Sequence, residues 1–245
     1  MRYLLFLVIL AGASCTVATA PSGPPPAVVR SEASATAAYQ RTVARIEPVA
    51  QSICRQENPS APALACDFEF RISTNPRLGV NAFQTLGRGG QPRVTFTMAL
   101  LRTMENDDEI AFILGHETAH QIARHIQQTV AQQQLGAVLL GGLISATGNA
   151  STGQVNEAAN LGAAIGRRVY SKRFELEADV IATYITMQSG YNAVRGAAPF
   201  ARMETGSSAF LATHPPSQQR FDTVRQTAAR IEADRRAGRT PRLPR

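Results

Sequence analysis

The sequence is poor in several residue types, and each shortage limits what the protein can be. It contains no tryptophan, three cysteines and a single lysine, Lys172, among 245 residues. The cysteines, at positions 15, 54 and 66, show no Cys-x-x-Cys spacing, which argues against a cysteine-ligated zinc module. Arginine supplies almost all of the positive charge behind the formal net charge of +7, and the arginine-rich residues 217–245 contain one aromatic residue, Phe221. Base-stacking sites need aromatic side chains among their basic groups, so we predict no nucleic-acid partner.

The N-terminus has the pattern of a bacterial export signal. Arg2 gives a positive start, and the apolar run at residues 4–10 is too short to span a bilayer. Residues 11–15 read AGASC and resemble a lipobox, although glycine stands where leucine is usual. We therefore predict a lipoprotein signal peptide over residues 1–15, with Cys15 carrying the lipid that holds the protein at the membrane.

Other readings of this end stay open. Cleavage after Ala20 would release a secreted protein, but Pro21 resembles a blocked site, and an uncleaved anchor is a further alternative. Thr16, in place of aspartate after the lipidated cysteine, favours the outer membrane, facing the periplasm. In that oxidising compartment Cys54 and Cys66 could pair and contribute about 3 kcal/mol, the alternative being two buried thiols.

Periodicity divides the rest of the chain. Residues 16–36 are rich in Pro, Ala and Ser and predict a flexible tether, whereas residues 37–55 predict a helix that Pro48 kinks or breaks. Alternating apolar and polar residues predict strands over the three segments 67–72, 80–86 and 91–97. The last strand, just before the helix described next, could offer a free edge to an extended peptide. The alternative is an ordinary half-buried edge strand, which the sequence alone favours.

Residues 110–127 have the pattern of an amphipathic helix. Apolar residues recur there at three- and four-residue steps, and Asn106 with Glu109 predicts a capped helix start. On that helix His116 and His120 share one face, where both imidazoles can bind one metal ion, and Glu117 can reach a water on that metal. We predict this helix to continue through residue 127, which would turn His125 away and give it a structural role.

A third ligand is expected from residues 174–179. Glu175 and Asp179 lie four apart on one helix face, so one can bind zinc while the other supports a ligand histidine. Glu177 is an alternative candidate for the zinc ligand, but it points away from the face that Glu175 and Asp179 share. Two histidines and one carboxylate leave a coordination position for water, which is the catalytic arrangement of zinc.

The apolar, glycine-rich residues 135–147 permit three interpretations. The segment is too short to span a membrane, so it could be a buried hairpin, a loop that shields the active site, or a segment that dips into a lipid surface. We favour a mobile loop packed near the cleft.

Four motifs in order resemble the family-48 zinc metallopeptidases, the gluzincin group that includes the CAAX prenyl proteases and envelope proteases. The resemblance covers residues 37–229 and rests on four stretches: residues 81–83 (NAF), 115–120 with Arg124-His125 following, 175–179 (ExxAD), and His214-Pro215 with Arg220. It implies an α+β fold, a mostly helical domain with a small mixed or antiparallel sheet whose edge strand flanks the zinc helix. The turn over residues 87–91 is longer than is usual in that family.

The resemblance also implies the site. One zinc ion per chain would be bound by His116, His120 and Glu175, with Asp179 supporting a ligand histidine. His214 would lie over the metal, as a fourth ligand at rest or an oxyanion donor, with Arg220 near it.

These observations predict a zinc metalloendopeptidase of the cell envelope. Its domain would span residues 37–238, followed by a disordered basic tail at 239–245. Glu117 would act as general base toward a zinc-activated water, and the substrates would be misfolded or misassembled envelope polypeptides. The alternative is a non-catalytic or latent zinc-binding chaperone or assembly factor.

Overall fold

The computed structural model describes residues 29–202, 210, 214 and 217–244, with the backbone alone at 161–171, 201 and 202. The predicted signal peptide, Cys15, most of the predicted tether and Pro215 lie outside these residues. The helices are α1 (Glu32–Glu57), α2 (Met98–Thr103), α3 (Asp107–Ile122), α4 (His125–Ser145), α5 (Thr152–Gln188), α6 (Ala193–Gly196), α7 (Pro199–Arg202) and α9 (Gln218–Arg236). The strands are β1 (Glu69–Ser73), β2 (Ala82–Leu86) and β3 (Pro92–Thr97), and short 3-10 turns are η1 (Ala63–Cys66), η2 (Pro76–Leu78) and η3 (Arg88–Gly90).

The three strands form a small mixed sheet in the order β1-β3-β2. β3 pairs in parallel with β1 and antiparallel with β2, so both of its edges are occupied. Both interpretations of residues 91–97, as a strand that binds peptide at a free edge and as an ordinary edge strand, are therefore wrong, because β3 is the central strand. The edge strand beside α3 is β2, whose Gln84 amide donates to the Gln121 side chain of α3 at 2.9 Å. The predicted fold is confirmed: it is a mostly helical α+β domain in which an edge strand flanks the metal helix, and that strand is β2 rather than β3.

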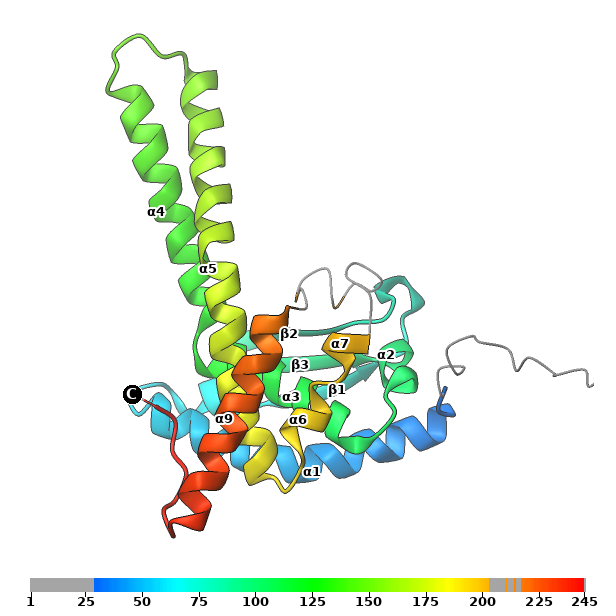
Figure 1. Cartoon of the computed structure of the whole chain (residues 1–245). Helices are drawn as coiled ribbons and strands as arrows, with labels where there is room; N and C mark the ends of the chain where they lie inside the picture. Colours follow the sequence, from blue (N-terminus) through cyan, green and yellow to red (C-terminus); the bar gives the residue numbers. More distant parts are fainter. Residues whose placement is uncertain (1–28, 203–209, 211–213, 215–216, 245) are drawn as a thin grey trace, which may run out of the picture.

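α1 runs along one side of the core (Figure 1). It begins at Glu32, inside the predicted tether, because the Ser31 hydroxyl accepts a hydrogen bond from the Ser34 amide and caps the helix. The helix continues through Pro48 without breaking. Its far end is joined to η1 by a disulfide between Cys54 and Cys66, both buried.

α3 lies at the centre of the domain, with almost every side chain buried. Its start follows the predicted cap: the Asn106 side chain accepts from the Glu109 amide at 3.1 Å, and the Glu109 carboxylate accepts in return from the Asn106 side chain. Gly115 lets α5 approach closely, since a Cβ there would lie 3.2 Å from the Ala182 carbonyl oxygen. The glycine before His116 thus brings the helix that carries the acidic residues next to the histidines.

α3 is shorter than predicted. It ends at Ile122, and Arg124 adopts a left-handed conformation with φ 57° and ψ 36° before α4 begins at His125. The prediction of one helix through residue 127 is therefore wrong, and His125 takes a new direction.

α4 and the first half of α5 form a long antiparallel hairpin that stands away from the body of the domain (Figure 1). Leu135, Val138, Leu139 and Leu143 are each more than half exposed on α4. The interpretation of residues 135–147 as a loop packed near the cleft is therefore wrong. Within the described part of the chain, no helix combines the length and the apolar character needed to cross a bilayer.

The C-terminal helix α9 packs across α5 and is followed by an ordered segment. Arg239 pairs with Asp234, and Leu243 packs against the core. The predicted disordered tail over 239–245 is thus not found among its described residues, because these contacts hold it to the domain.

Candidate metal centre

α3 supplies three of the predicted site residues from two adjacent turns. His116 is fully buried and Glu117 is 1% exposed, while His120 opens toward a cleft. The Nε2 atoms of His116 and His120 lie 3.1 Å apart. His116 directs its other nitrogen, Nδ1, to Asp179 Oδ1 at 3.0 Å, so in the neutral ring Nδ1 carries the proton and Nε2 presents a lone pair. Two imidazole lone pairs that face each other need a proton or a cation between them.

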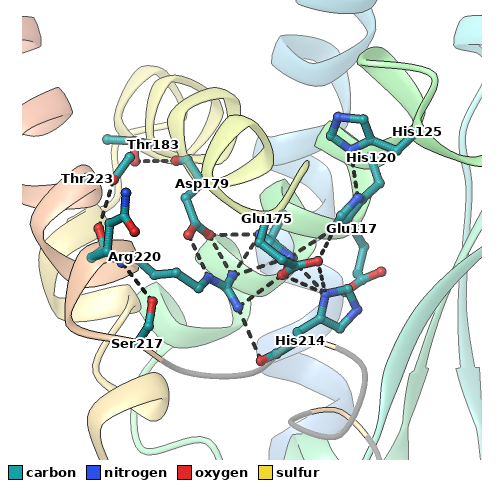
Figure 2. Close-up of polar contacts among 12 residues, drawn as sticks. Glu117, His120, His125, Glu175, Asp179, Thr183, His214, Ser217, Arg220 and Thr223 are labelled. Atoms are coloured by element: carbon teal, nitrogen blue, oxygen red, sulfur yellow. Dashed lines mark hydrogen bonds and ion pairs between the residues drawn. The ribbon is translucent and has the colours of Figure 1, made fainter. Parts of the chain in front are cut away.

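α5 brings the acidic side chains to these histidines. Glu175 Oε2 lies 3.3 Å from His116 Nε2, and Oε1 lies 3.5 Å from His120 Nε2. Asp179, one turn further on, contacts the opposite nitrogen of His116. Glu177 points elsewhere, with its Oε2 3.5 Å from His125 Nε2. The structure therefore places Glu175 with the converging nitrogens and Asp179 behind them, as the resemblance implied (Figure 2).

His214 completes the cluster from the segment before α9. Its Nδ1 lies 3.0 Å from both carboxylate oxygens of Glu175 and 3.2 Å from His116 Nε2. Its Nε2 is 3.5 Å from Glu117 Oε1. His214 thus has one nitrogen within the group of donor atoms and the other beside the predicted general base.

Arg220, from the first turn of α9, holds the acids together from behind. Its Nε and Nη2 donate to the two oxygens of Asp179, each at 2.7 Å, and Nη1 lies 3.0 Å from Glu175 Oε2. Nη1 also donates to the His214 backbone carbonyl at 3.2 Å, and the guanidinium stacks 4.1 Å from the Phe200 ring centroid. One side chain that is 2% exposed therefore links α5, the segment of His214 and α9 (Figure 2).

The donor set fits a small divalent cation. One donor atom from each of His116, His120, Glu175 and His214 lies within 4.8 Å of all the others. Ligands about 2.0–2.2 Å from one tetrahedral zinc ion lie roughly 3.3–3.6 Å apart, and the contacts given above span 3.0–3.5 Å. Imidazole nitrogens with one carboxylate are the donors that zinc and neighbouring transition metals prefer.

Protonation of the metal-free cluster follows from its contacts. Burial of the His116 ring opposes protonation, but hydrogen bonds to Asp179 and Glu175 outweigh it and raise the pKa of His116 to about 9. Burial and the adjacent His116 hold the pKa of His120 well below its usual value. Burial alone would raise the pKa of Glu175, yet His214 and His116 keep it well below the ordinary range. Glu175 therefore stays ionised, and His116 must lose a proton before a metal can bind it.

Glu117 lies beside a cleft, and one of its carboxylate oxygens lacks a hydrogen bond from the described residues. Among the residues that the structure describes, Glu117 Oε1 is buried and accepts no hydrogen bond. The cleft beside it has a volume of about 380 Å³ and reaches from Phe83 and Gln84 of β2 to the first turns of α4. A buried carboxylate oxygen that accepts no hydrogen bond, next to a cation site, is placed to accept a proton from a water molecule.

Sequence reasoning missed His125. The prediction turned it away from the site, but its Nδ1 lies 2.8 Å from His120 Nδ1 and it also lines the cleft. Its ring stacks on Phe174, with centroids 4.2 Å apart. Burial lowers the pKa of His125, so the ring is neutral near pH 7. The left-handed residue that redirects it is an arginine, and neither glycine nor proline marks the position in the sequence.

Fold and site together define a class of protein. The domain is mostly helical, and α3 carries the His-Glu-x-x-His motif. Glu175 of a later helix joins the two histidines at the cation site, and Glu117 lies beside it. This combination defines a metallopeptidase.

The family follows from comparison with known proteins. Residues 40–228 match peptidase family M48, which is most of the chain, and the protein belongs to that family. The beta-barrel assembly-enhancing proteases of Yersinia pestis and Escherichia coli strain K12 are each 26% identical to it, over 185 and 180 residues. The mitochondrial metalloendopeptidase OMA1 of Saccharomyces cerevisiae is 26% identical over 167 residues. These alignments cover 71%, 69% and 64% of this chain but 37%, 36% and 46% of the relatives, so the chain spans less than half of their length.

Proposed function

We propose that the protein is a zinc-dependent metalloendopeptidase of the bacterial cell envelope that cleaves misfolded or misassembled envelope proteins. The observation that carries this proposal is the buried Glu117 oxygen beside four converging donor atoms, which accepts no hydrogen bond from the described residues. A structural metal site needs no such carboxylate, whereas peptide hydrolysis needs a base next to the attacking water.

Each residue of the cluster then has a chemical role. His116, His120 and Glu175 would hold the ion, which supplies Lewis acidity that acidifies water and polarises a peptide carbonyl. Glu117 accepts the proton of the attacking water and returns it to the leaving amine. Asp179 accepts from His116 Nδ1 and keeps Nε2 free for the ion.

His214 and Arg220 act on the opposite side of the cluster. His214 directs Nε2 toward Glu117, where an N–H could donate to the oxyanion that forms on the carbonyl. Arg220 lies against both Asp179 and Glu175, where its positive charge offsets the negative charge of the two buried carboxyl groups.

The cleft favours an extended, apolar substrate. Phe83, Ile126, Val130 and Phe174 give it a mainly apolar wall, and the outer edge of β2 lies beside it. A substrate strand could pair with that edge while its side chains occupy the cleft. Unfolded chains present both an unpaired backbone and apolar side chains, which supports misfolded proteins as the substrate class.

Three observations support the envelope as the location. The lipobox-like residues 11–15 would place a lipid on Cys15, and the disulfide between Cys54 and Cys66 suits an oxidising compartment. Two relatives are named for enhancing beta-barrel assembly, and we extend an envelope role to this chain on that basis. Thr16 after the lipidated cysteine favours the outer membrane, facing the periplasm.

The direct test is Glu117→Gln, with the exposed Glu157→Gln of α5 as the matched control. The Glu117 variant should bind one zinc ion per chain yet lose at least 100-fold in cleavage of an unfolded envelope protein, because it keeps the donor set and lacks the base. The control should cleave at the wild-type rate. Equal cleavage by Glu117→Gln and wild type would reject the mechanism. Envelope proteins retained by the inactive variant would identify the substrates.

A latent or non-catalytic zinc protein is the second candidate, and one contact favours it. His214 Nδ1 lies among the donor atoms, where it could occupy the position that water needs. If His214 closes the site, His214→Ala should increase cleavage; if it stabilises the oxyanion, the same variant should lose activity. If the wild-type protein binds zinc and suppresses aggregation, and neither it nor His214→Ala cleaves any substrate, the non-catalytic alternative is established.

A further inference from the structure

His125 contacts the predicted metal ligand His120 from outside the group of converging donor atoms. A continuous helix would separate residues five apart by more than a quarter of a turn, but the left-handed Arg124 rotates His125 back toward the site. His125 is 3% exposed, and its Nδ1 lies 2.8 Å from His120 Nδ1 (Figure 2). This is hydrogen-bond distance, so one of the two nitrogens must donate and the other accept.

The direction of that bond follows from the other side of the His120 ring. His120 directs Nε2 toward His116 Nε2 and Glu175, where it needs a lone pair to bind a cation. A neutral imidazole has one N–H, which in His120 must then be at Nδ1. His120 Nδ1 is therefore the donor and His125 Nδ1 the acceptor. His125 in turn carries its own proton on Nε2.

The surroundings of His125 agree with this tautomer. Its Nε2 is buried, and within the described part of the chain it makes no hydrogen bond, but Glu177 Oε2 lies 3.5 Å away as an anionic neighbour for the N–H. Phe174 stacks on the ring almost in parallel, at an interplanar angle of 18°, and fixes its plane. Phe174 precedes Glu175 in the chain, so one turn of α5 carries an ion-binding carboxylate and also supports the ring behind His120.

We propose that His125 is a positioning residue of the metal centre. It accepts the Nδ1 proton of His120, so that Nε2 of His120 faces the ion as a lone pair in a fixed orientation. Metal-binding histidines usually donate this proton to a carboxylate, a carbonyl or water, and loss of such a partner weakens metal binding about 10–100-fold. Here a second imidazole takes that place, with Glu177 behind it.

Two variants separate the acceptor from the packing. His125→Phe keeps an aromatic ring against Phe174 and removes the acceptor, whereas His125→Asn can place an oxygen near the Nδ1 position. We expect zinc affinity, measured by competition with a chromophoric chelator, to fall 10–100-fold for His125→Phe and to stay within about threefold of wild type for His125→Asn. Equal affinity of His125→Phe and wild type, or an equal loss in both variants, would overturn the proposal.

A measurement on the unaltered protein covers the case in which a variant does not fold. The ¹⁵N shifts of the imidazole nitrogens in the zinc-loaded protein should show a proton on Nδ1 of His120 and on Nε2 of His125. A proton on Nδ1 of His125 would refute the proposal. The inference rests on the metal site proposed above but not on proteolysis: a chain with this proton arrangement that cleaves nothing would reject the proposed function and leave His125 in its role.

Discussion

Removal of the Arg220 guanidinium tests how the buried charges of the site depend on one another. Arg220 is 2% exposed and Asp179 is fully buried, and two hydrogen bonds of 2.7 Å join them. Arg220→Met would leave the carboxylates of Asp179 and Glu175 side by side without their shared cation. Breaking a buried ion pair from one side costs about 3–5 kcal/mol. For a domain of this size that corresponds to a decrease in Tm of roughly 10 °C.

The assay is thermal or urea unfolding of the metal-free protein in excess chelator. Arg225→Met is the matched control, since Arg225 is exposed on the same helix and its replacement should change the unfolding free energy by less than about 1 kcal/mol. The double variant Arg220→Met with Asp179→Leu removes both charges and should be more stable than Arg220→Met alone. A loss below about 1 kcal/mol for Arg220→Met would refute this account, as would additive losses in the double variant.

Three further predictions concern the disulfide, a close contact between helices and the protonation of the metal centre. Replacing Cys54 and Cys66 by serine should lower the unfolding free energy by about 3 kcal/mol in urea denaturation, and a reductant should then have no further effect. Gly196→Ala should cost about 2–3 kcal/mol, because its Cβ would clash with the Asp108 backbone oxygen of α3. Gly142→Ala, with open space around it, should cost nothing by the same assay. Zinc affinity, measured by chelator competition, should rise up to tenfold per pH unit from pH 7 and level off near 9, since His116 must lose its proton to bind metal; a flat profile between pH 7 and 8.5 would contradict this.

Much of the metal centre could be predicted because the relevant residue spacings lie within single helices. The spacing of His116 and His120 and the Asn106 cap depend on one helix, and the four-residue step from Glu175 to Asp179 depends on another. The close packing of α3 against α5 depends on Gly115, which has no Cβ at the contact. Hydrophobic periodicity alone does not reveal this contact. The choice of Glu175 over Glu177 came from resemblance and agrees with the side-chain directions found.

The errors arose where neighbours distant in sequence decide the outcome. β2 and β3 both alternate, and only the pairing of β3 with β1 and β2 makes β3 central. α3 ends before Arg124 although neither glycine nor proline breaks it, because the chain must turn where α4 leaves the domain. The apolar residues 135–147 suggested packing near the cleft, yet they form a helix whose apolar side chains remain exposed.

The nitrogens and oxygens of the centre come from segments far apart along the chain: His116 and His214, in contact at 3.2 Å, are separated by 98 positions. A polypeptide that is still emerging during synthesis holds only some of these atoms and cannot form the complete centre. The peptidase chemistry proposed above would therefore begin only after α9, which carries Arg220, has docked against α5.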